Sequence, residues 1–156
     1  GAQFAHRFAY AHSQRVSGLV LGSAGWYTMP DPRRPYPFGT ADARGLEAVR
    51  FNLRAATRLP TLVVVGADDD REDDVELNRT AEVMQCQGRH RLARARTWVD
   101  AMTGYAKKQG LVGAVELRVL PGIGHYPQIE APLLVLKHYL AFRDNVQSPP
   151  RRAVGS

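Results

Sequence analysis

Residues 62–65 (LVVV) and 115–120 (VELRVL) are short apolar runs, and each leads into a loop that carries glycine and an ionisable side chain. The loop at 66–70 reads GADDD, and the loop at 121–125 reads PGIGH. A short apolar run bounded by turn residues is typical of a strand buried in a parallel sheet. Because ligands of open parallel sheets bind at the carboxyl ends of the strands, these stretches indicate both the fold and the place of any chemistry.

The rest of the chain alternates between helical and extended patterns. A further apolar run at 16–21 predicts a strand that is buried on both faces. The expected helices cover 2–12, 41–58, 76–109 with a break near Gly88, and 130–143. Strands that alternate with helices of this length predict an α/β fold with about three parallel strands and flanking helices. Residues 25–40 are rich in proline and aromatic side chains, so we expect an ordered loop or a small lid there.

The chain is expected to form one domain over residues 1–146, with a polar, proline-rich tail at 147–156 that we expect to be disordered. Two features indicate that this domain is a piece of a larger one. The first helix begins at the first residue without a capping side chain, and the strand at 16–21 has nothing upstream to pair with. The exposed edge of that strand is also a candidate surface for self-association.

Composition limits the possible partners. The 156 residues are 44% hydrophobic, and neither a membrane-spanning run nor a signal-peptide pattern is present, so no membrane partner is expected. A single cysteine, Cys86, cannot form an internal disulfide, which favours a reducing, cytoplasmic location on this chain alone. The net charge of +6 invites comparison with nucleic-acid-binding proteins. No docking motif accompanies the charge, so we expect a solvated basic surface and no nucleic-acid partner.

The two loops place an acid and a histidine at the same rim of neighbouring strands. A carboxylate within reach of an imidazole can hold that imidazole in one tautomer, as a catalytic base requires. Asp68, Asp69 and Asp70 are the candidate acids, and the alternative is an acidic turn without a task. Likewise, His125 beside a glycine-rich turn can merely cap backbone groups. A calcium loop through Asp68, Asp70 and Glu72 lacks the required glycine and distal glutamate, so no metal is expected.

The order G-x-x-D (Gly66, Asp69) and then G-x-G-H (Gly122, Gly124, His125) resembles the acid and base loops of the α/β-hydrolases, whose triad order is nucleophile, acid, histidine. The opening stretch, GAQFAHRFAYAHSQRVSGLVLGSAG, is similar to the segment that follows the nucleophile elbow of that family. The resemblance covers residues 1–143 and implies the C-terminal half of an α/β-hydrolase fold.

The resemblance also implies roles for individual residues. Asp69 would be the acid and His125 the base, while Gly1 would close a G-x-S-x-G elbow whose serine lies two positions before it. The oxyanion donors would also lie outside the chain, so we expect the 156 residues alone to hydrolyse nothing. The complete protein would be a serine esterase without a cofactor, acting on small-molecule carboxylic esters. The aromatic, proline-rich segment loosely resembles polyhydroxybutyrate depolymerases and feruloyl esterases.

Aromatic side chains near the rim are candidates for substrate binding, with a packed lid as the alternative. These residues are Trp26, Tyr27, Tyr36 and Tyr126. Ser23 also follows a strand, but Leu21 stands where the first glycine of an elbow belongs, so Ser23 is not expected to be a nucleophile. The competing function is a non-catalytic binding or assembly module, which size-exclusion chromatography distinguishes through a dimer or larger species.

Overall fold

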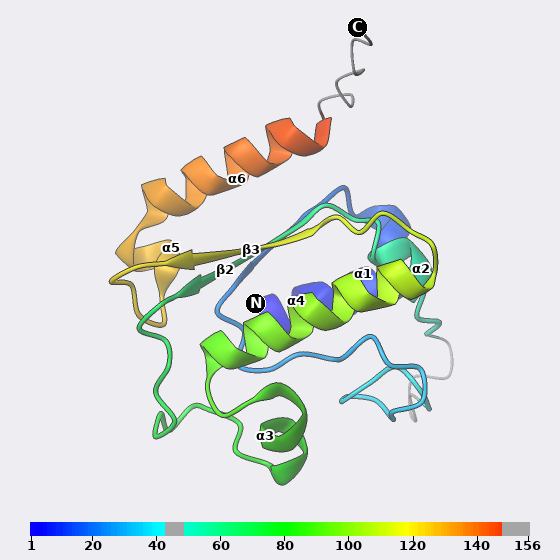
Figure 1. Cartoon of the computed structure of the whole chain (residues 1–156), viewed down its shortest axis with the longest axis horizontal. Helices are drawn as coiled ribbons and strands as arrows, with labels where there is room; N and C mark the ends of the chain where they lie inside the picture. The colour runs from blue at the N-terminus through cyan, green and yellow to red at the C-terminus, as the bar shows by residue number, and fades with distance from the viewer. Residues whose placement is uncertain (43–48, 148–156) are drawn as a thin grey trace, which may run out of the picture.

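The computed structural model describes residues 1–42 and 49–147, and these residues alternate between helices and strands (Figure 1). The elements are α1 (Ala2–His12), a short 3-10 turn (Ser13–Arg15), β1 (Leu19–Gly22), α2 (Leu53–Ala56), β2 (Thr61–Gly66), α3 (Ala81–Gln87), α4 (Arg91–Lys108), β3 (Val115–Leu120), α5 (Pro127–Glu130) and α6 (Pro132–Gln147). In the part of the chain described, the strands form one parallel sheet in the order β1-β2-β3. The α/β fold and the three parallel strands are therefore confirmed.

The central strand β2 is buried along its whole length because helices cover both of its faces. Val63 and Val65 pack on the side of α1 and α4, whereas Leu62 and Val64 pack with Phe142 of α6. Successive side chains of a strand point to opposite faces, so the run LVVV serves both layers at once. Figure 1 shows α6 on one side of the sheet and α1 and α4 on the other.

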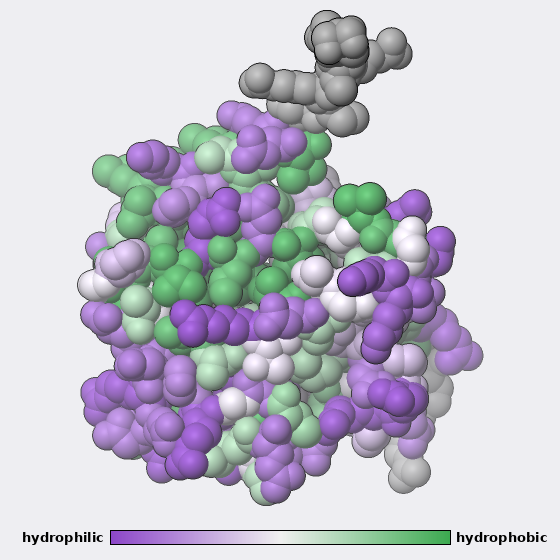
Figure 2. Space-filling model, viewed as in Figure 1, coloured by the Kyte–Doolittle hydropathy of each residue, from purple (hydrophilic) through white to green (hydrophobic). Residues whose placement is uncertain are grey.

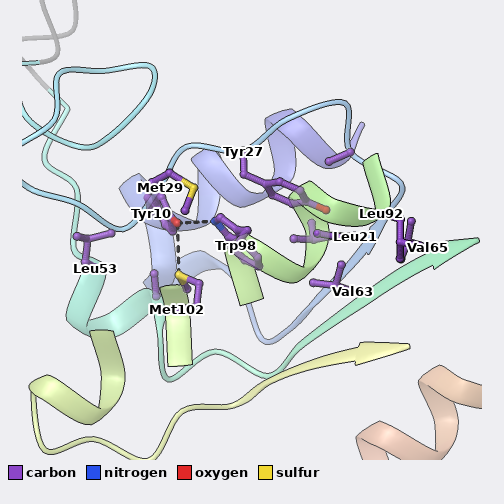
Figure 3. Close-up of a cluster of buried hydrophobic side chains, with 13 residues drawn as sticks. Tyr10, Leu21, Tyr27, Met29, Leu53, Val63, Val65, Leu92, Trp98 and Met102 are labelled. Carbon is purple, nitrogen blue, oxygen red and sulfur yellow. Dashed lines mark hydrogen bonds between the residues drawn. The ribbon is translucent and has the colours of Figure 1, made fainter. Parts of the chain in front are cut away.

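A hydrogen-bonded aromatic cluster joins α1, the loop after β1 and α4 (Figure 3). The Trp98 indole Nε1 donates to the Tyr10 hydroxyl and to the Thr28 carbonyl oxygen, each at 3.1 Å. The Tyr10 hydroxyl in turn donates to the Thr28 carbonyl oxygen at 3.0 Å. Tyr27 stacks on the Trp98 ring with centroids 5.0 Å apart. The cluster fixes the loop that begins at the carboxyl end of β1, which is the rim where chemistry was expected.

The expected break near Gly88 is confirmed, because α3 ends at Gln87 and Gly88 has a φ of +112° that only glycine adopts easily. The expected helix at 41–58 is wrong: among its described residues, only Leu53–Ala56 are helical, and 43–48 lie outside the described residues. Tertiary contacts outweigh the helical pattern there. Phe51 stacks on Tyr36, and Asn52 caps α2 by accepting from the Ala55 N–H.

The strand expected at 16–21 is shorter and less buried than predicted. It runs from Leu19 to Gly22, and only Leu21 is buried, while Val20 is 40% exposed. Burial on both faces is thus wrong, because β1 lies at the edge of the sheet. The last expected helix is split, since Pro132 starts α6 after the short α5. Residues 148–156 of the expected tail lie outside the described residues.

The side of the molecule at α6 exposes much apolar surface. Figure 2 shows green apolar surface over the sheet and parts of α6, whereas the loop between β2 and α3 is largely purple. Leu133 and Leu136 of α6 are among the exposed residues, at 79% and 50%. Self-association through this side or through the β1 edge stays a prediction. Within the described residues, no helix has the length and hydropathy needed to cross a membrane.

Candidate active site

The acid loop after β2 and the base loop after β3 are bonded to each other through their backbones. The Ala67 N–H donates to the Leu120 carbonyl oxygen at 2.9 Å, and the Asp68 N–H donates to the Ile123 carbonyl oxygen at 3.0 Å. Gly66 makes this close approach possible, because a Cβ atom at Gly66 would overlap the carbonyl oxygens of the neighbouring loop. The glycine of the G-x-x-D motif therefore sets the distance between the two loops.

Asp69 and His125 meet where these loops touch. The Asp69 side chain is 5% exposed, and its Oδ2 lies 3.1 Å from Nδ1 of His125. An ionised carboxylate only accepts hydrogen bonds, so Nδ1 carries the ring proton and its N–H donates a hydrogen bond to Asp69. Nε2 is then the unprotonated ring nitrogen, on a side chain that is 25% exposed. This is the arrangement of an imidazole held ready to take a proton from a nucleophile.

The neighbours of Asp69 take no part in this contact. Asp68 and Asp70 are exposed, whereas Asp69 is buried, which agrees with the preference for Asp69 that the motif offset gave. No cluster of three potential metal ligands occurs within residues 1–42 and 49–147. The catalytic role of Asp69 and His125 remains a prediction, and the structure supplies the geometry on which it depends.

Glu130 is a residue of this site that sequence reasoning missed. Its carboxylate accepts hydrogen bonds from the Gly124 N–H and from the Tyr126 N–H, each at 2.9 Å. It therefore binds the backbone on both sides of His125. These two hydrogen bonds lower the pKa of the Glu130 carboxyl. The available signal was an acidic residue shortly after a glycine-rich turn, where a helix begins.

A cavity of about 730 Å³ opens over the rim beside His125. It is lined by α1, by the loop after β1 and by the base loop, and its lining includes Gly1, Arg7, Ser23, Tyr36, Arg91 and Tyr126. Of the expected substrate-binding side chains, Tyr36 and Tyr126 therefore lie at the cavity. The Ser23 hydroxyl is buried without a hydrogen-bond partner, and Ser23 has a φ of +38°. The structure therefore gives Ser23 no hydrogen bond to His125.

The other two aromatic candidates lie elsewhere. Tyr27 is completely buried and stacks on Trp98, so its expected place at the pocket wall is wrong. Trp26 is half-buried and is not part of the cavity lining, because its ring packs between Phe38 and the Arg7 guanidinium, whose carbon lies 4.4 Å from the ring centroid. Both rings serve packing because the loop after β1 folds inward against α1 and α4.

We expect Gly66→Ala to separate the acid and base loops. The added methyl group would overlap backbone oxygen atoms that cannot rotate away, so one of the two loops must move. The expected loss of stability is about 1–3 kcal/mol in a urea titration, together with weaker coupling between Asp69 and His125. Gly104→Ala in α4 is the matched control, because nothing lies within 4 Å of its added Cβ. Equal stability of the Gly66 variant and the wild type would contradict this prediction.

The chain resembles solved structures of hydrolases. No protein-family model matches the sequence, and no curated protein sequence matches it either. Among solved structures, the chain is similar to poly(aspartic acid) hydrolase-1 from Sphingomonas sp. KT-1, with a TM-score of 0.76 and 31% identity over 87% of this chain and 50% of that one. A poly(3-hydroxybutyrate) depolymerase from Bordetella parapertussis gives a TM-score of 0.75 and 27% identity over 90% and 47%. The chain thus spans about half the length of each.

Proposed function

Since the chain shares the α/β-hydrolase fold with these two hydrolases, we propose that it supplies the acid and base of a Ser-Asp-His triad in an enzyme that hydrolyses carboxylic esters. The observation that carries the proposal is the 3.1 Å contact between the buried Asp69 carboxylate and Nδ1 of His125. Few structural roles need an imidazole held in one tautomer beside an open cavity.

In the proposed reaction, Nε2 of His125 takes the proton of a serine hydroxyl while the serine oxygen bonds to the ester carbonyl carbon. The same nitrogen then gives the proton to the leaving alkoxide, and Asp69 stabilises the imidazolium formed in between. Water hydrolyses the acyl-enzyme through the same transfer. No cofactor enters this scheme.

The position of α1 supports a serine just before Gly1. Gly1 is the N-cap of α1 and lines the same cavity as His125, so the proposed serine two positions earlier would lie at the entrance to α1, on the side of this cavity. The partial positive charge at the start of α1 also favours an oxyanion there. The proposed enzyme is therefore the longer chain that carries this serine.

One observation favours a second substrate class, in which the scissile bond belongs to an acidic molecule. Arg7 lines the cavity, and its Nη2 is buried without a hydrogen-bond partner. No ion pair of Arg7 occurs among the described residues. One of the two similar structures is a poly(aspartic acid) hydrolase, whereas the other is a polyester depolymerase. A carboxylate on the substrate would give the Arg7 guanidinium an ionic partner from the cavity side.

The test compares the 156-residue chain with a chain extended upstream through the expected Gly-x-Ser-x. We expect the extended chain to hydrolyse p-nitrophenyl esters and to be labelled by a fluorophosphonate at the added serine, and the shorter chain to do neither. A neutral ester and its carboxylate-bearing counterpart, assayed in parallel, separate the two substrate classes. Turnover by the 156-residue chain alone, or an upstream sequence without this serine, would overturn the proposed triad.

A further inference from the structure

A buried arginine contacts the proposed catalytic acid on the side away from the histidine. Arg91 begins α4, and its side chain is 3% exposed. Its Nη1 lies 3.4 Å from Asp69 Oδ1 and 2.5 Å from Asp74 Oδ2. The two oxygens of Asp69 are thus divided between a guanidinium and an imidazole. The start of α4 binds Asp69 a second time, since the Leu92 N–H donates to the Asp69 carbonyl oxygen at 3.1 Å.

Burial explains why Asp69 needs such a partner. A carboxylate removed from water loses several kcal/mol of hydration unless charges and hydrogen bonds replace it, and otherwise it protonates or turns toward solvent. Neutral His125 offers Asp69 a single donor. Arg91 is the cation that compensates the buried charge, and it is itself too buried to be satisfied by water.

Asp74 limits how strongly Arg91 binds Asp69. The contact of Arg91 with Asp74 is shorter than its contact with Asp69, so the guanidinium charge is shared between two carboxylates. The negative charge of Asp69 is therefore only partly neutralised by Arg91, and it still attracts the imidazole. Counting formal charges, Asp69, Asp74 and Arg91 sum to −1, and an imidazolium at His125 brings the group to zero. The imidazolium that forms during the proposed acyl transfer therefore lies beside a net negative charge.

We propose that Arg91 is a positioning residue for the hydrolysis: its charge, shared with Asp74, holds the Asp69 carboxylate aimed at Nδ1 of His125. The inference rests on the proposed function, because it gives Arg91 a task only through the acid-base pair. It differs from a purely structural salt bridge in one respect. Loss of the charge should change which ring nitrogen of His125 carries the proton, even in a variant that still folds.

The experiment uses the 156-residue chain labelled with ¹⁵N-histidine, whose ring nitrogen shifts report which nitrogen carries the proton at mildly alkaline pH. In the wild type we expect His125 to hold the Nδ1–H tautomer alone. Arg91→Gln, which keeps a donor and removes the charge, should turn this into a mixture of tautomers. Arg91→Lys, which keeps the charge, should restore the single tautomer. Arg96→Gln, on the exposed side of α4, is the matched control and should leave the spectrum unchanged.

Each outcome decides one claim. A folded Arg91→Gln variant with the wild-type spectrum overturns the role of Arg91 and leaves the triad proposal intact. If that variant does not fold, Arg91→Lys decides alone, since a folded lysine variant with mixed tautomers would show that the charge does not hold Asp69. A wild-type His125 without an Nδ1–H preference would instead remove the acid-base pair itself, which is a failure of the proposed function.

Discussion

Asp69→Asn, introduced into a chain that carries the serine, is expected to lower kcat about 10⁴-fold, because the asparagine amide can donate to Nδ1 and so favours the wrong histidine tautomer. The shape of the side chain is unchanged, and the 3.1 Å contact with His125 can persist with its donor and acceptor exchanged. The measurement is steady-state hydrolysis of a p-nitrophenyl ester. We expect KM to change little, because Asp69 is buried and lies behind the imidazole.

The exposed neighbours of Asp69 provide matched controls. Asp68→Asn and Asp70→Asn remove the same charge one position away, and neither side chain is buried. We expect both variants to keep wild-type kcat within a factor of about two, since exposed charges at this distance are screened by solvent. A large loss of kcat in the Asp68 variant, with little loss in the Asp69 variant, would show that Asp68 and not Asp69 is the catalytic acid.

The central strands could be read from the sequence because burial on both faces leaves a strong local pattern. The run at 62–65 is apolar throughout, and β2 is buried throughout. The meeting of Asp69 and His125 followed from topology, since parallel neighbouring strands end at one rim. The burial of β1 was harder to predict, because its residues are as apolar as those of a central strand although the strand is partly exposed.

The supporting residues of the site could not be read in the same way. Arg91 reaches Asp69 from a helix that starts 22 positions further along the chain, and no local pattern encodes such a contact. Glu130 left only a weak helix-start signal. Tyr27 shows the converse problem, because an aromatic residue in a loop beside the rim can point into the core as easily as into the cavity. Contacts that are set by tertiary packing form only in the folded chain and leave no local pattern in the sequence.

A second buried histidine leads to a prediction about acid stability. His6 in α1 is fully buried among Tyr10, Tyr27 and Trp98, with Nδ1 2.9 Å from the Ala2 carbonyl oxygen. Its Nε2 accepts from the Thr28 N–H at 2.9 Å, so the ring is neutral with its proton on Nδ1. Burial is the main reason that the pKa of His6 falls from 6.5 to about 3.

The sign of the pH effect follows from this lowered pKa. The unfolded chain takes up a proton on His6 below pH 6.5, whereas the folded chain does so only near pH 3, so stability is complete above 6.5 and is lost as the pH falls from 6.5 toward 3. The full loss amounts to about 4–5 kcal/mol, of which about 2–3 kcal/mol appears between pH 7 and pH 4.5. The free energy of unfolding, from urea titrations at several pH values, measures it.

The variant His6→Gln separates this contribution from the titration of carboxylates such as Glu130, which also destabilises the fold in acid. Glutamine can keep a donor and an acceptor near Ala2 and Thr28 but does not titrate. We therefore expect it to be less stable than the wild type at pH 7 and to lose less stability on acidification. His138→Gln in α6 is the control and should follow the wild-type curve. If the free energy of unfolding falls in parallel for the wild type and His6→Gln as the pH is lowered, the buried ring does not control acid unfolding. If the two curves instead converge toward pH 4.5, the core around His6 is the acid-sensitive part of the fold.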